Sequence, residues 1–154
     1  MSTIDVVVRM IHSITAAAWV GSVLFVAFGL LPSALDGSLN ASPSQAIVSR
    51  FRWLSRGCSA LLFVTGGHLA GTLYTVDSLT GSARGHLVLA MLALWFVLTG
   101  LVEVAAGKLD RGFDDQKVRS PARQAKPFLY AASVVAVLLL VDATLIVYGS
   151  GLVY

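Results

Sequence analysis

Five histidine, aspartate and glutamate residues lie inside long apolar stretches of the sequence: His12, His68, His86, Glu103 and Asp142. Ionisable groups are costly in hydrocarbon, and within a membrane segment they usually mark an ion pathway, a proton relay or a ligand site. Imidazole nitrogens bind copper and haem iron, and a carboxylate can bind a metal or orient a ligating histidine. These residue types therefore indicate a redox-metal site.

Four of these residues are expected on one side of the membrane. At about 1.5 Å per helical residue, His12 lies roughly 9 Å inside its apolar stretch, His68 about 12 Å and Asp142 about 10 Å. His86 begins its stretch on the same side, closer to the surface. The sequence therefore predicts that His12, His68, His86 and Asp142 supply the ligands of a shared metal site. The alternative is that each residue has a separate structural role.

The surroundings of His68 are rich in small and hydroxyl side chains. Thr65, His68 and Thr72 share one face of a helix at i, i+3 and i+4 spacing. Three glycines interleave with them: Gly66, Gly67 and Gly71. Such glycines either allow close helix packing in a membrane or leave room for a flat cofactor beside His68.

Four apolar runs must position these residues. They lie at about 6–31, 53–76, 86–106 and 128–148. Each approaches or exceeds the roughly 20 residues that an α-helix needs to cross a bilayer. Pro32 is expected to close the first run, and Pro127 to stand at the first helical position of the fourth. The sequence therefore predicts one all-α integral membrane domain over residues 1–154, a four-helix bundle of antiparallel neighbours.

The composition supports a lipid environment. Hydrophobic residues make up 56% of the chain and charged residues 12%, whereas soluble domains carry about 25% charged residues. The mean hydropathy is +0.81. The net charge of +3 comes from basic residues in short connections, which indicates membrane topology rather than nucleic-acid binding. A single cysteine, Cys58, excludes an intrachain disulfide, and the first apolar run is too long for a cleavable signal peptide.

The placement of lysine and arginine predicts the orientation. Nine of these residues flank the first and third connections, and the other side has only Arg9 and Arg84. The positive-inside rule then places those two connections in the cytoplasm and both termini outside. The expected location is the plasma membrane, as a multi-pass protein in contact with lipid. Glu103, at the inner end of the third run, is expected to pair with a cytoplasmic Lys or Arg.

A short motif runs along the first apolar run. Its residues are Arg9-Met10-Ile11-His12, Ala18-Trp19-Val20-Gly21, Leu24-Phe25 and Leu31-Pro32. This motif resembles the first helix of the CopD-like superfamily, over about residues 8–32. That superfamily includes the copper-resistance CopD membrane domain and the HemJ-type protoporphyrinogen oxidases, small four-helix proteins that bind haem b through a first-helix histidine.

The resemblance implies that His12 corresponds to that first-helix histidine. It extends less closely over residues 52–67 and 85–100. HemJ-type proteins also have a lysine early in the third helix, in a Gly-Trp-Leu-His-Ala-Lys-like context. The corresponding segment here, Gly85–Met91, contains no lysine, so whether the protein is an enzyme stays open.

The function that the sequence favours is a membrane cytochrome. His12 and His68 would be the axial ligands of a haem b, and Arg9 and Arg84 would pair with its propionates. Asp142 would orient a ligating histidine. Such a protein would act in electron transfer or haem-linked oxidation.

Two other functions fit the same residues. One is copper transport or homeostasis, with a copper site built from His12, His68, His86 and either Asp142 or a methionine. The other is a non-catalytic subunit of a larger membrane complex, in which the polar residues form helix–helix hydrogen bonds. Four spans leave little interior for a private channel, so a homo-oligomer is compatible with transport.

Overall fold

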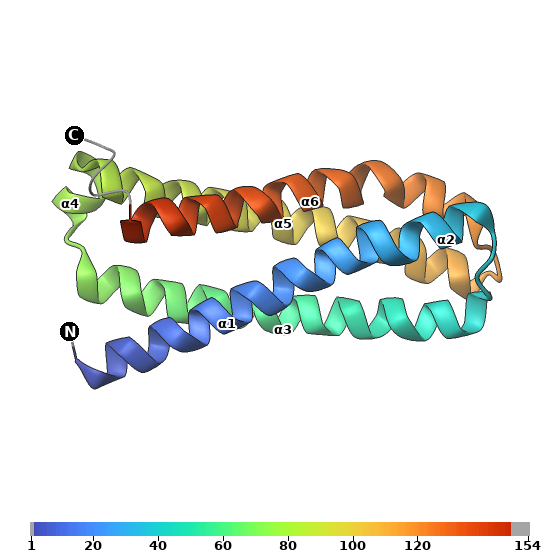
Figure 1. Ribbon diagram of the computed structural model, residues 1–154, viewed down its shortest axis with the longest axis horizontal. Coiled ribbons are helices and arrows are strands. Elements are labelled where there is room, and N and C mark those ends of the chain that lie inside the picture. Colours follow the sequence, from blue (N-terminus) through green and yellow to red (C-terminus); the bar gives the residue numbers. More distant parts are fainter. Residues whose placement is uncertain (1, 149–154) are drawn as a thin grey trace.

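The computed structural model describes residues 2–148, which form a bundle of long helices (Figure 1). The elements in chain order are α1 (Thr3–Phe25), the π-helical turn η1 (Val26–Leu30), α2 (Leu31–Asp36), α3 (Ala41–Leu73), α4 (Val76–Gly81), α5 (Ala83–Asp114) and α6 (Arg119–Tyr148). No strand occurs in this range. The all-α fold class predicted from the sequence is confirmed.

The first helical segment runs from α1 through η1 into α2 without a break. Pro32 was expected to end it, but the helix continues to Asp36 and ends at Gly37, whose φ of 72° is left-handed. The reason is that η1 ends at Leu30, so that only Leu31 separates this turn from the proline. A π-helical turn already interrupts the i→i−4 ladder, so the donor that Pro32 lacks is not missed. The expectation that Pro32 closes the segment is therefore wrong.

The last helix begins earlier than its apolar run. Pro127 was expected at the first helical position, but it lies inside α6, which starts at Arg119. Pro121 stands in the first turn instead, where backbone N–H groups have no helical acceptor and a proline costs little. The position predicted for Pro127 is wrong because apolarity marks the part of a helix that lies in lipid, not where the helix begins.

The helices alternate in direction, and the first one crosses the bundle obliquely (Figure 1). Its α1 part packs on α3, and its α2 part packs on α6. The start of α1, the short helix α4 and the last turn of α6 lie at one end of the bundle, here called the α4 end. The start of α1 and the end of α6 thus lie at the same end of the bundle, which agrees with the prediction that both are on one side of the membrane. Its placement outside the cell stays a prediction.

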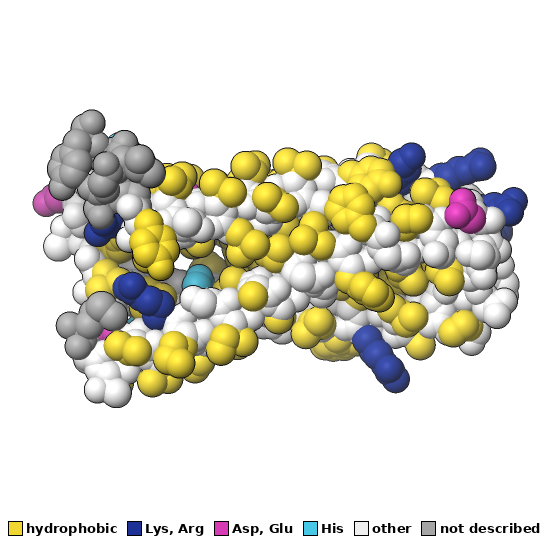
Figure 2. Space-filling model, in the orientation of Figure 1, with side chains coloured by type: hydrophobic (Ala, Val, Ile, Leu, Met, Phe, Trp, Pro, Cys, Tyr) yellow, Lys and Arg dark blue, Asp and Glu magenta, His cyan; other side chains and the backbone are white. Residues whose placement is uncertain are grey.

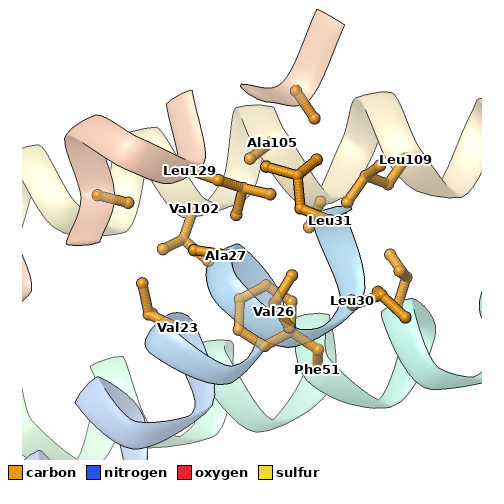
Figure 3. Packing of buried hydrophobic residues seen from close by; sticks show 14 of the residues in the cluster. Val23, Val26, Ala27, Leu30, Leu31, Phe51, Val102, Ala105, Leu109 and Leu129 are labelled. Atoms are coloured by element: carbon orange, nitrogen blue, oxygen red, sulfur yellow. The ribbon is translucent and has the colours of Figure 1, made fainter. Parts of the chain in front are cut away.

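The buried core lies away from the α4 end, where α1, η1 and α2 meet α3, α5 and α6 (Figure 3). Val26, Leu31, Leu109 and Leu129 interdigitate there. Fully buried alanines surround them: Ala27, Ala34, Ala105, Ala106, Ala122, Ala125, Ala132 and Ala136. Small side chains let helix backbones approach closely, which is how membrane helices gain packing energy without a hydrophobic driving force.

Large apolar side chains cover the outside of the bundle, such as Ile14, Phe25 and Phe96, which are 67%, 63% and 60% exposed. Three helical segments are long and apolar enough to cross a membrane: Thr3–Asp36, Ala83–Asp114 and Arg119–Tyr148. The chain is therefore a multi-pass membrane protein. Arg50, Arg52 and other polar residues make α3 less apolar, so its crossing and the count of four spans stay predictions.

Trp19 joins α1 to α3. The indole is 1% exposed, and its Nε1 donates a hydrogen bond of 2.6 Å to Ser55 Oγ. Replacing Trp19 by phenylalanine removes this donor and leaves a cavity, so we expect the free energy of unfolding to fall by about 1 to 2 kcal/mol. Unfolding of the detergent-solubilised protein, followed by circular dichroism, measures this loss. Trp53→Phe is the control, because Trp53 is 70% exposed; equal losses in both variants would contradict the prediction.

Candidate metal centre

His12 is held between α1 and α3 by one hydrogen bond. Its Nδ1 lies 2.7 Å from Oγ1 of Thr65, a buried residue of α3. Gly66 closes the site on one side: a Cβ built on this glycine would come within 3.2 Å of His12 Cε1. Because the hydrogen bond uses Nδ1, the other ring nitrogen, Nε2, remains for a further partner.

His68 pairs with a different group of the first helix. Its Nε2 lies 3.4 Å from Oδ1 of Asp5, and the His68 side chain is 39% exposed. Asp5 is fixed in turn by a reciprocal capping pair with Ser2 at the start of α1. His68 therefore lies nearer the α4 end than the contact between His12 and Thr65. The two predicted axial ligands contact neighbouring helices but engage separate partners.

His86 lies at the connection between α4 and α5. Its Nε2 donates a hydrogen bond of 2.7 Å to the carbonyl oxygen of Thr80, and its side chain is exposed. Arg84 is exposed nearby on the same helix. Arg9 is half-buried on α1 and lines a shallow apolar groove with Val6 and Met10. The predicted pairing of these arginines with haem propionates is not tested by this arrangement.

Asp142 is the buried carboxylate of α6. It is 7% exposed, and within residues 2–148 its Oδ2 has no hydrogen-bond partner. It is one of the buried residues of α6 and lies further along the helix than Ala132, Ser133 and Ala136. A buried carboxylate oxygen without a partner is costly, and native structures usually satisfy such an atom with a proton, an ion or water.

The predicted site residues thus lie at the same end of the bundle but do not meet at a common point. Their positions along the helices put all four toward the α4 end: His12 in the first half of α1, His68 near the end of α3, His86 in the first turn of α5 and Asp142 near the end of α6. Figure 2 shows that the visible face is hollowed near this end and that a histidine side chain lies in the hollow. Among the described residues, no three His, Cys, Asp or Glu side chains come close enough to hold a metal ion. The four-residue ligand set stays a prediction.

Sequence reasoning missed the partners of both histidines. Thr65 was placed on a common stripe with His68, yet it bonds His12. Gly66 likewise lies against His12, whereas the glycines were expected beside His68. Asp5 was not singled out at all. The signal that could have found it is the spacing of Asp5 and His12, seven residues apart and hence on one face of α1.

Away from the α4 end, the contacts of Glu103 confirm that it pairs with a basic residue, as expected. Its carboxylate accepts hydrogen bonds from Arg52 Nε at 2.8 Å and from Arg56 Nε at 3.1 Å. Arg52 Nη1 also lies 3.5 Å from Asp110 Oδ2. These groups are each partly exposed and join α3 to α5. Glu103 therefore pairs with arginine, as the sequence predicted, and contributes to structure rather than to the candidate metal centre.

The fold and these polar contacts define a class of protein: an all-helical, multi-pass membrane protein with ligand-type side chains between its helices. A family model described as copper resistance protein D matches residues 45–149. The chain therefore belongs to the CopD family, which confirms the family suggested by the first helix. This match covers α3 to α6, so the correspondence of His12 rests on the motif in α1. No curated protein and no solved structure matches the chain.

Proposed function

We propose that the protein binds copper ions near the α4 end of the bundle and carries them across the membrane, with His12 as a ligand. The observation that carries this proposal is the geometry of His12. Its ring is fixed through Nδ1 inside the helix pair, and Nε2 is left for a metal. Ligating histidines are typically oriented in this way, by a hydrogen bond from the second ring nitrogen.

The donor chemistry suits copper. Imidazole nitrogen is a good ligand for copper ions. The Asp142 carboxylate, whose Oδ2 has no hydrogen-bond partner among residues 2–148, is a second candidate donor at the same end. His68 and His86 remain the other predicted ligands. A transported ion must be bound strongly enough to enter and weakly enough to leave. Ligands spread over several helices are compatible with such stepwise transfer.

The family match favours copper over haem b. The sequence alone preferred a haem held by His12 and His68, but the family description refers to copper resistance. We therefore propose copper as the ion, and cargo rather than a resident cofactor as its role.

Metal analysis together with absorbance spectra tests the proposal. The detergent-purified protein is expected to bind copper stoichiometrically and to show no Soret band, whether oxidised or reduced with dithionite. In proteoliposomes with a copper gradient, it is expected to raise copper flux above that of empty vesicles. A Soret band with sharp α and β bands after reduction would support the haem cytochrome instead. A colourless protein that binds no copper would support the role of a non-catalytic subunit.

A further inference from the structure

Thr65 has a hydrogen-bonding pattern that fixes the protonation of its neighbour. Its Oγ1 lies 2.7 Å from the carbonyl oxygen of Leu61 and 2.7 Å from His12 Nδ1. A hydroxyl group has one hydrogen to donate, and a carbonyl oxygen can only accept. Two oxygens 2.7 Å apart require that hydrogen between them. The Thr65 hydroxyl therefore donates to Leu61 and accepts from His12 Nδ1.

This assignment determines the form of the imidazole. In a neutral histidine one ring nitrogen carries the hydrogen and the other carries a lone pair. With the hydrogen on Nδ1, the lone pair is on Nε2. A metal binds the lone-pair nitrogen, so the contact with Thr65 prepares Nε2 for ligation before any ion arrives.

The surroundings restrict the alternatives. Thr65 is 6% exposed, so water has little access to its hydroxyl. Gly66 lies against Cε1 of the ring, where even one additional carbon would come within 3.2 Å. The ring can therefore come close to the backbone of α3 at Gly66, and Thr65 is the acceptor that its Nδ1 meets there.

We propose that Thr65 is the positioning residue of His12: its hydroxyl holds the imidazole in the Nδ1-protonated form and turns Nε2 toward the ion. The statement about the imidazole stands on the contacts of Thr65 alone. Its consequence for metal binding rests on the proposed copper function. The two parts are therefore tested by separate measurements.

The first measurement is nitrogen-15 NMR of the metal-free protein labelled at histidine. The pH is 8, above the ordinary histidine pKa of about 6.5. Protonated and unprotonated ring nitrogens have well-separated shifts, and the signals lost in His12→Gln identify His12. Nδ1 is expected to be protonated in the unmodified protein and in Thr65→Ser. In Thr65→Val the population of the Nε2-protonated form of His12 is expected to rise. An Nε2-protonated His12 in the unmodified protein, or an unchanged spectrum in Thr65→Val, overturns the proposal.

The second measurement is copper affinity, by competition with a chelator. Thr65→Val is expected to bind copper about 10-fold more weakly, as is usual when the partner of a ligating histidine is removed, and Thr65→Ser is expected to restore affinity. Thr72→Val is the matched control, because Thr72 Oγ1 also donates to a carbonyl of its own helix, that of His68, at 3.0 Å. Within residues 2–148 the Thr72 hydroxyl makes no hydrogen bond to His12, so the Thr72→Val variant is expected to bind copper normally.

The outcomes separate the two proposals. If the unmodified protein binds no copper but His12 is Nδ1-protonated and responds to Thr65→Val, the copper function fails and the role of Thr65 in fixing the ring stands. If copper binding depends on His12 while Thr65→Val changes neither the spectrum nor the affinity, the role of Thr65 fails and the copper function stands. Equal weakening in Thr65→Val and Thr72→Val also overturns the role of Thr65, because it indicates a general effect of removing a hydroxyl from α3.

Discussion

Replacing His12 by glutamine is expected to weaken copper binding by about 100-fold, equivalent to about 2.8 kcal/mol. Removing a group that only orients a ligand already costs roughly 10- to 100-fold, so the loss of the ligand itself belongs at the upper end of that range or beyond. Glutamine can still donate a hydrogen bond from its amide to Thr65, and it therefore preserves the contact between α1 and α3. Chelator competition with the purified variant measures the loss.

His86→Gln is the matched comparison for this variant. His86 is the same residue type at the same end of the bundle, but its side chain is exposed and its Nε2 already donates to Thr80. We expect His12→Gln to lose much more affinity than His86→Gln. Equal losses would contradict this ranking and would show that His12 and His86 contribute equally to the site. Unchanged affinity in His12→Gln would exclude His12 as a ligand.

The two ends of the bundle differ in a way that suits this function. Away from the α4 end, buried alanines and large aliphatic side chains fill the interior, and Glu103 joins α3 to α5 through Arg52 and Arg56. Toward the α4 end, the contacts between helices are polar, from Thr65 with His12 to His68 with Asp5. Close packing resists rearrangement, whereas polar contacts can exchange one partner for another. An ion that replaces such a partner can bind without disturbing the packed half.

The fold could be predicted because a chain that crosses lipid has to meet one simple physical requirement. A segment that crosses hydrocarbon must satisfy its backbone internally, so long apolar runs in this composition become helices. The ends of these helices were harder to predict. Pro32 lies inside a helical segment because it follows the π-helical turn η1, and Pro127 does so because polar turns that begin at Arg119 precede it in α6. Hydropathy identifies the part of a segment that lies in lipid, and it contains no information about the polar turns of the helix beyond that part.

The site could be predicted only in part. His12 and Asp142 were singled out because polar groups are costly in apolar helices. Their positions in the first half of α1 and near the end of α6 put both toward the α4 end. Thr65 could not be assigned to His12, because a helix turns by about 100° per residue and a small rotation exchanges one partner for another. The oblique crossing of α1 over α3 decides that choice, and crossing geometry depends on the packing of the whole bundle. The partner of Glu103 was easier to predict, because several arginines were available at its depth.

A second large effect is expected from substitution of Gly85, which lies near the connection between α4 and α5. This glycine is buried where α4 folds back onto α5. A Cβ at this position would overlap the carbonyl oxygens of Ser78 and Leu79. These are backbone atoms, which cannot rotate away as the tip of a side chain can. Gly85→Ala is therefore expected to lower the free energy of unfolding by about 2 to 3 kcal/mol, the upper part of the range for overpacking.

Gly100→Ala is the control, because Gly100 is exposed on the same helix and, apart from its own stretch of helix, no described residue lies within 4 Å of the added carbon. Alanine there is expected to be neutral or to stabilise the helix by up to about 1 kcal/mol. Denaturation in mixed micelles measures both changes, and hydrogen exchange locates them. If the clash acts as described, the amides of Val76–Gly81 lose protection in Gly85→Ala and keep it in Gly100→Ala, because only the former pushes α4 away from α5. Equal stability of the two variants would mean that α4 is not held against α5, and that the hydrogen bond between His86 and Thr80 does not fix this end of the bundle.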